Sequence, residues 1–116
     1  MIYLARPYTD EIAPRERYKH ESSVLHELTG RLIVCTIPLT DYYDIGFDKS
    51  LDGEIWDMAE TMIKQCSMLV YCGDSKGVRK EIAMAKKYGI HIEEYYQLIK
   101  YYTELEEVMD EVDDRG

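Results

Sequence analysis

One segment, from Cys72 to Ile82 (CGDSKGVRKEI), carries residue types that suit phosphate binding and carboxylate chemistry. The apolar run before it and the helically spaced apolar residues after it predict a strand, a tight turn with two glycines, and a helix that begins at Ser75. The first amides of such a helix have no partners within it and carry the positive end of its dipole, which favours an anion. Glu81 lies four residues after Gly77 on the same helix face, so its carboxylate would lie beside a phosphorylated ligand. The alternative is an ordinary strand–helix turn with a capping serine and a surface glutamate.

The elements that must position this segment alternate between strands and helices. The pattern predicts strands near residues 1–5, 31–37, 68–71 and 90–92, helices near residues 14–29, 50–66, 75–88 and from 93 onward, and a polar loop from 38 to 49. Such alternation predicts an α/β fold, a small doubly wound (Rossmann-like or flavodoxin-like) parallel sheet with strand order 2-1-3-4 and helices on both faces. We expect an α/β core over residues 1–92 and an acidic, tyrosine-rich helix over residues 93–116.

The last helix has an apolar seam whose members alternate four and three residues apart, namely Leu98, Tyr102, Leu105, Met109 and Val112. A heptad-like seam of this kind is typical of a coiled coil. A final helix laid against the sheet has the same spacing and is the interpretation that we favour. The helix is therefore expected to pack either on the core or at a subunit interface.

Ligands of doubly wound sheets bind beyond the carboxyl ends of the strands, at the point where the strand order reverses. Here that point lies between the first and third strands, so the loops Arg6–Asp10 and Gly73–Gly77 are expected to meet. The residues expected near this crevice are Tyr3, Arg6, Tyr8, Asp10, Asp74, Ser75, Lys76, Gly77 and Glu81, with possible additions from Thr40, Asp41 and Tyr42 or from Asp57 and Glu60.

Several catalytic and cofactor-binding motifs do not occur in the sequence, which excludes the corresponding classes of chemistry for this crevice. No hydroxyl or thiol with a histidine base supports a hydrolase triad, and neither the GxxxxGK[ST] nor the GxGxxG motif occurs. No CxxC or HExxH pattern occurs either, so we expect no metal and no cofactor. A phosphate or ribose cradle with two or more carboxylates remains. Paired carboxylates suit chemistry at an anomeric carbon, where one attacks C1′ or stabilises positive charge and another acid handles the leaving group or water.

Three segments share a pattern with a known family: Ile2–Thr9 (IYLARPYT), Trp56–Tyr71, and Ser75–Ala85, which fits S-x-G-V-x-x-E-[IL]-x-x-A. On these motifs the chain resembles the nucleoside 2-deoxyribosyltransferase-like superfamily, and most closely its short bacterial and phage members with a YLASPYS-like start. Arg6 departs from that pattern because it stands where a small residue is usual. The match frames residues 1–92, and its third motif is the most specific.

The resemblance implies a role for each matched position. Glu81 would be the nucleophile that attacks C1′ of a 2-deoxynucleoside or nucleotide and forms a glycosyl-enzyme ester. Ser75 and Gly77 would bind the 5′-phosphate, and Tyr3 with the Arg6–Tyr8 loop would hold the sugar and base. Arg6 would fill part of the pocket or grip a phosphate bidentately.

An acid on the helix before the third strand assists near the leaving base in the family. That acid stands eight residues before an aspartate that opens the strand; Ser67 takes the place of this aspartate here, and eight residues before Ser67 is Ala59. Asp57 and Glu60 flank it on roughly one helix face, and either could serve if the helix is shifted. The chain is therefore expected to be an N-glycosidase or deoxyribosyltransferase, or alternatively a nucleotide-binding or sequestering protein without catalysis. A third possibility is an interaction protein that works through its acidic tail.

The size and net charge of the chain indicate which partners to expect. The 116 residues suffice for one domain, and the formal charge of −9, from 23 acidic against 14 basic residues, opposes binding to a nucleic acid polymer. The partner expected instead is a small-molecule nucleoside or nucleotide, with a homodimer implied by the resemblance and by the seam of the last helix.

The three cysteines (Cys35, Cys66 and Cys72) fit buried thiols in a reducing compartment. No run of eighteen apolar residues and no cationic leader occurs, so we expect no membrane partner and a cytoplasmic location.

Overall fold

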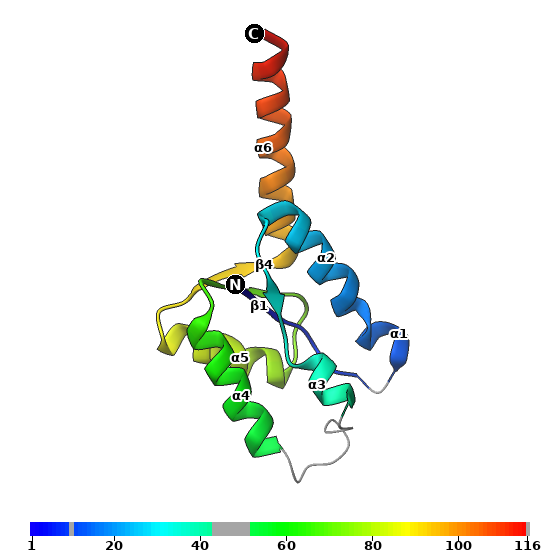
Figure 1. Cartoon of the computed structure of the whole chain (residues 1–116), viewed down its shortest axis with the longest axis vertical. Coiled ribbons are helices and arrows are strands. Elements are labelled where there is room, and N and C mark those ends of the chain that lie inside the picture. Colours follow the sequence, from blue (N-terminus) through cyan, green and yellow to red (C-terminus); the bar gives the residue numbers. More distant parts are fainter. Residues whose placement is uncertain (10, 43–51, 116) are drawn as a thin grey trace.

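A four-stranded parallel sheet forms the centre of the protein and has the predicted order β2-β1-β3-β4 (Figure 1). The computed structural model describes residues 1–9, 11–42 and 52–115. The strands are β1 (Ile2–Ala5), β2 (Ile33–Val34), β3 (Met68–Tyr71) and β4 (His91–Glu94). β1 pairs with β3 along its whole length, from Ile2 opposite Met68 to Ala5 opposite Tyr71. The predicted small doubly wound α/β fold is confirmed.

Helices cover both faces of this sheet, because successive strand residues point to opposite sides. The helices are α1 (Ile12–Arg15), α2 (Arg17–Thr29), α3 (Ile37–Tyr42), α4 (Asp52–Gln65), α5 (Lys76–Lys87) and α6 (Tyr95–Arg115). One face packs against α4 and α5 in a cluster of Tyr3, Ala5, Ala59, Ile63, Cys66, Leu69, Val78 and Ala85. The other packs against α2 and α6 in a cluster of Ile2, Leu4, Leu25, Val70, Cys72, Tyr95 and Leu98. These two cores fix which side chains of β1 can meet which helix.

The loops after β1 and β3 meet, as the switch-point argument predicts. The Cys72 amide extends the strand pairing by donating to the Ala5 carbonyl at 2.8 Å. Gly73 follows with φ +89°, and a Cβ built on it would lie 3.1 Å from Pro7 Cδ. Only glycine tolerates both the backbone angle and this contact, so the two loops are held together here.

The first half of the chain differs from expectation in three elements. The helix expected over residues 14–29 is two helices, because the backbone at Glu16 (φ −79°, ψ −3°) leaves the regular helical turn. The second strand is only Ile33–Val34, a short edge strand, although the pattern predicted residues 31–37. The expected loop after it begins instead with α3, where Pro38 occupies the first turn of a helix and loses no helical hydrogen bond.

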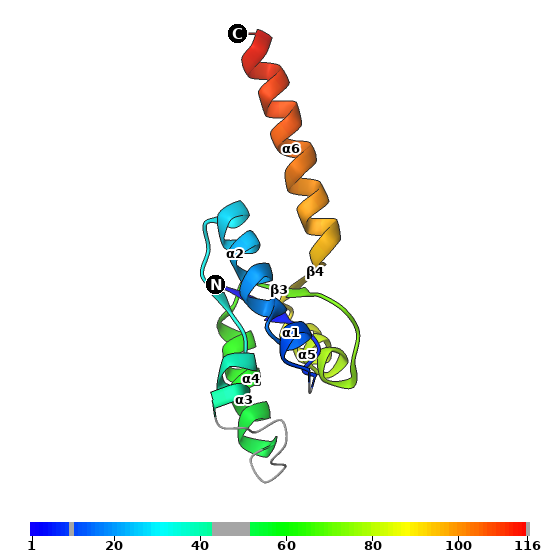
Figure 2. The ribbon, with the colours of Figure 1, turned by 90° about the vertical axis from the view of Figure 1, so that its right-hand side faces the viewer.

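The last helix packs on the core at its base only. Tyr95 and Leu98 are buried, and Ile99 and Tyr102 pack partly against the α2 side of the sheet. Residues 103–109 are all exposed, and α6 extends away from the body in both views (Figures 1 and 2). The expectation of a helix laid against the sheet therefore holds for its first two turns alone. Among the described helices, none has the length and apolar character that crossing a membrane requires.

Gly73 and Gly30 form a matched pair for testing the loop contact. Both have positive φ, but nothing lies within 4 Å of a Cβ at Gly30. Gly30→Ala should therefore lower the free energy of unfolding by about 1 kcal/mol through the backbone angle alone. Gly73→Ala should lower it by roughly 1 kcal/mol more, because Pro7 must also move. Urea unfolding of both variants measures the difference, and equal losses would show that the Pro7 contact has no energetic weight.

Candidate functional site

Glu81 and Tyr3 form a buried polar pair between α5 and the sheet. Val78, Glu81 and Ala85 are the buried positions of α5, spaced three and four apart, so the glutamate stands within an otherwise apolar stripe. Glu81 is only 7% exposed and Tyr3 is fully buried in β1. The Tyr3 hydroxyl donates a hydrogen bond to Glu81 Oε2. The predicted carboxylate is therefore held inside the protein, with one oxygen occupied by Tyr3.

Burial sets the protonation of this pair. Loss of water raises the pKa of Glu81 from 4.5 to about 7, while the hydrogen bond from Tyr3 acts in the opposite direction. Burial and the neighbouring Glu81 also raise the pKa of Tyr3 far above its usual range, and a hydrogen bond with the Thr36 side chain opposes that rise. Tyr3 therefore remains a hydrogen-bond donor. A pKa of about 7 means that the protonated and charged forms of Glu81 are both populated near neutral pH, and such perturbed groups are enriched at functional sites.

The start of α5 has the serine cap that the sequence predicts. Ser75 caps the helix, and its Oγ accepts from the Val78 amide at 3.1 Å. Its hydroxyl proton can still be donated, and the first-turn amides of Lys76 and Gly77 have no acceptor within the helix. These three donors precede Glu81 by four to six residues, or between one and two helical turns.

Trp56 closes one side of this turn from α4. A Cβ on Gly77 would lie 3.6 Å from the indole Cη2, an ordinary van der Waals distance, so the indole packs directly against the helix start. Lys80 places its Nζ 4.1 Å from the centroid of the Trp56 ring, in cation–π contact. The indole therefore connects α4 to the residues expected to hold a phosphate.

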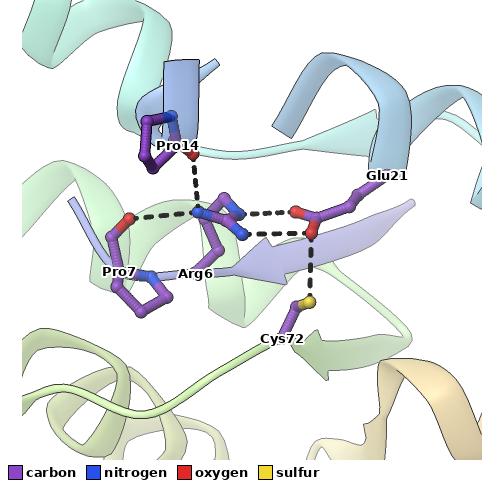
Figure 3. Close-up of polar contacts among 5 residues, drawn as sticks. All are labelled: Arg6, Pro7, Pro14, Glu21 and Cys72. Carbon is purple, nitrogen blue, oxygen red and sulfur yellow. Dashed lines mark hydrogen bonds and ion pairs between the residues drawn. The ribbon is translucent and has the colours of Figure 1, made fainter. Parts of the chain in front are cut away.

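Arg6 has a different environment from the one expected, because it is paired inside the protein (Figure 3). Its Nε lies 2.5 Å from Glu21 Oε1 and its Nη2 lies 3.1 Å from Oε2, a bidentate pair with α2. Its Nη1 donates to the Pro14 carbonyl at 3.0 Å. The side chains of Arg6 and Glu21 are 8% and 6% exposed. The pair ties the loop after β1 to both α1 and α2.

Cys72 completes this second polar cluster. Its Sγ donates to Glu21 Oε2 at 3.1 Å. Burial and the adjacent carboxylate raise the pKa of the thiol to about 11, so it remains protonated and serves as a donor. Glu21 thus accepts from Arg6 and Cys72, and both of its oxygens are satisfied.

The two polar clusters lie on opposite faces of the sheet. Tyr3 belongs to the core under α4 and α5, whereas Leu4 and Cys72 belong to the core under α2 and α6. The structure therefore brings Tyr3 to Glu81 but directs Arg6 to α2. The Tyr8 hydroxyl contacts Arg15 Nη1 at 3.4 Å, and the Arg15 guanidinium lies over the Tyr8 ring, which places Tyr8 beside α1.

Asp57 and Glu60, the two acids of α4 considered for this role, do not supply a partner for Glu81. Asp57 is exposed to solvent. Glu60 accepts a hydrogen bond from the Tyr88 hydroxyl and lies 3.6 Å from Lys87 Nζ, at the far end of α5. Ala59, 2% exposed, faces the core that contains Tyr3. Among the described residues of α4, Ala59 therefore faces the sheet at the position where the resemblance implies an acid.

Several contacts were not anticipated from the sequence. Glu21 lies four residues before the buried Leu25, so its position in the helical stripe was a usable signal for a buried charge. Thr36 and Cys35 lie beside the Tyr3 hydroxyl in a segment predicted to be plain strand. Asp10 and the side chains of Asp41 and Tyr42, considered as possible lining residues, fall outside the described part of the structure.

The Arg6–Glu21 pair should behave as a buried ion pair. Arg6→Met or Glu21→Leu alone leaves the other charge buried without a partner, which should lower the free energy of unfolding by about 3–5 kcal/mol. The double variant should recover much of this loss. Urea unfolding of the four proteins measures the coupling. Asp74→Ala with Arg79→Ala is the matched control, because this bidentate pair is about two-thirds exposed and should couple little. Equal coupling in the two cycles would contradict the assignment.

The raised pKa of Glu81 predicts that the folded protein loses stability as pH rises. The folded form holds this proton up to about pH 7 and the unfolded form only to about 4.5, so the loss falls between these values. It should amount to about 3 kcal/mol, at about 1.4 kcal/mol per pH unit. Glu81→Gln, which cannot ionise, should lack this decline in urea unfolding at pH 4.5 and 8, whereas Glu60→Gln should keep it. An unchanged decline in Glu81→Gln would refute the burial of an ionisable Glu81.

The resemblance to the nucleoside 2-deoxyribosyltransferase-like superfamily depends on sequence motifs alone. Comparison with known proteins adds no family to this resemblance. No protein-family model matches the chain, and no curated protein matches it at a significant level. The chemistry of the site is therefore inferred from its own contacts.

Proposed function

We propose that the chain is a nucleoside or nucleotide N-glycosidase, or a 2-deoxyribosyltransferase, in which Glu81 attacks C1′ of a (deoxy)nucleotide. The observation that carries the proposal is a buried carboxylate, oriented by Tyr3, six residues after the serine that caps the same helix. A glutamate in an apolar stripe costs stability, and such a cost is typical of a working group. The resemblance in the Ser75–Ala85 motif gives the same role to the same residue.

The reaction follows from the contacts of Glu81. Tyr3 occupies Oε2, so Oε1 is the oxygen that would form the ester bond to C1′. As that bond forms, the C1′–N bond breaks, and the base leaves with the electron pair and takes up a proton. Water or a second base then attacks C1′, and Glu81 departs as a carboxylate, giving hydrolysis or transfer respectively. A pKa of about 7 leaves a large carboxylate fraction at neutral pH.

The start of α5 would hold the 5′-phosphate. The Ser75 hydroxyl and the amides of Lys76 and Gly77 are donors at the positive end of the α5 dipole. A phosphate there places the sugar on the side of Glu81, one turn along the helix. Arg6 is left out of this assignment because Glu21 and the Pro14 carbonyl use its donors.

A second candidate function is nucleotide binding without turnover. The observation that favours it is the arrangement of α4. Asp57 is exposed, Glu60 accepts a hydrogen bond from Tyr88, and the residue that faces the site is Ala59. Without an acid near the leaving base, a purine or pyrimidine must depart by taking its proton from water. The phosphate cradle is independent of this acid, so binding would persist.

The catalytic role of Glu81 is tested by base release from a panel of deoxynucleoside monophosphates and nucleosides. We expect the wild type to release at least one base, and Glu81→Gln to reduce kcat by about 10³-fold or more while the fold is kept, since only the attacking carboxylate is lost. Glu60→Gln is the matched control and should change kcat little, because its partners are Tyr88 and Lys87.

Calorimetry with the same nucleotides separates the two candidate functions. Binding of a monophosphate without base release would favour the binding protein, and tighter binding than that of the parent nucleoside would support the Ser75 cradle. A wild type that neither releases a base nor binds any nucleotide would overturn both candidates.

A further inference from the structure

We propose that the outer part of α6 is a docking helix for a basic amphipathic helix of another protein. α6 is a 21-residue helix, about 31 Å long at 1.5 Å per residue, and only its base is anchored. Beyond Tyr102 every residue through Met109 is exposed (Figure 1). This part contributes nothing to the candidate site, so its role is separate from the chemistry at Glu81.

The exposed part of α6 carries a continuous apolar stripe. Four exposed apolar residues form this stripe: Tyr101 (60% exposed), Leu105 (41%), Val108 (56%) and Met109 (60%). They are spaced four, three and one residues apart along the helix. At 100° per residue they span about 100° of the helix surface. The buried Leu98 lies on the same stripe, so the face that closes the core at the base of α6 continues uncovered along the helix.

A cavity continues this stripe onto the body of the protein. It has a volume of about 300 Å³ at the base of α6, beside the edge strand β4. Leu98, Tyr101 and Tyr102 line it from α6, and Met68, His91 and Glu93 line it from the strands. A partner helix lying along the stripe would therefore end against a recess that can take an apolar side chain.

Charge identifies the kind of partner. α6 carries seven acidic residues, all after Thr103, against Lys100 and Arg115. Glu104 and Glu106 lie on either side of the stripe by helical geometry. Acids three and four residues apart repel one another, and acids near a helix C-terminus oppose its dipole. Lysines or arginines flanking the apolar face of a partner would relieve both effects.

A second copy of this chain fits the stripe less well. Two α6 helices in contact would place their axes about 8–10 Å apart, within about one Debye length of each other at physiological salt. Each copy would bring seven acidic residues and two basic ones to the contact, so the two helices would repel each other. The most basic described helix, α5, offers Lys76, Arg79, Lys80, Lys86 and Lys87, but none of the exposed large apolar residues lies on it. The homodimer expected from the sequence therefore stays a prediction for some other surface.

Three synthetic helical peptides test the proposal against the full chain by fluorescence anisotropy. The first has leucine at heptad positions a and d and lysine at e and g, the second replaces each lysine with glutamate, and the third replaces each leucine with serine. We expect only the first to bind the wild type, with an affinity that falls as salt is raised.

Variants of exposed residues locate the contact. Leu105→Asp with Val108→Asp should weaken binding of the first peptide at least tenfold, and Glu104→Gln with Glu106→Gln should weaken it several-fold at low salt. Ile12→Asp is the matched control, since Ile12 is 63% exposed on α1, away from α6, and should leave binding unchanged. Circular dichroism checks that each variant is folded.

Four results would overturn the proposal. The first peptide could fail to bind, or the serine peptide could bind equally well, which would leave only non-specific charge attraction. The Leu105→Asp, Val108→Asp variant could bind the first peptide as tightly as the wild type does. Sedimentation of the chain alone at neutral pH could also show a dimer that this double variant dissociates, which would make a second copy the occupant of the stripe.

Discussion

The parallel pairing of β1 with β3 is the constraint on which the rest of the structure depends. The register places the ends of these two strands side by side, so that Ala5 lies opposite Tyr71 and the loops that follow must meet. The same pairing fixes the alternation of side chains. Tyr3 is directed to the α5 side, and its neighbour Leu4 to the α2 side. Two polar clusters a few residues apart in sequence are thereby separated by the thickness of a sheet.

The separation gives the two clusters different energetic roles. Arg6 and Glu21 have opposite charges, so their mutual attraction offsets part of the desolvation cost of burying them. The pair also connects β1 to α1 and α2. Glu81 has a neutral hydroxyl for a partner, and its charged form is uncompensated. Only the second arrangement leaves a carboxylate whose charge a bound molecule could compensate, and for this reason our proposal places the chemistry at Glu81 and not at Arg6.

Periodicity and turn chemistry in the sequence were sufficient for the strand order, for the meeting of the two loops and for the cap at Ser75, because each depends on local pattern and chain topology. They were insufficient where a long-range partner decides the outcome. The sequence around Arg6 predicts a ligand contact, because nothing near it reveals Glu21 fifteen residues later. Pro38 indicates the end of a strand, although proline also suits the first turn of a helix. The assignment of Asp57 and Glu60 depended on helix rotation, which packing decides.

The contact between Trp56 and Gly77 has a practical consequence. Trp56 is the only tryptophan in the chain, and its indole lies against the first turn of α5 with Lys80 above the ring. Indole emission responds to nearby charge and to exclusion of water. The protein thus contains its own optical reporter at the helix start, and a ligand that reaches this turn will register in the intrinsic fluorescence without a label.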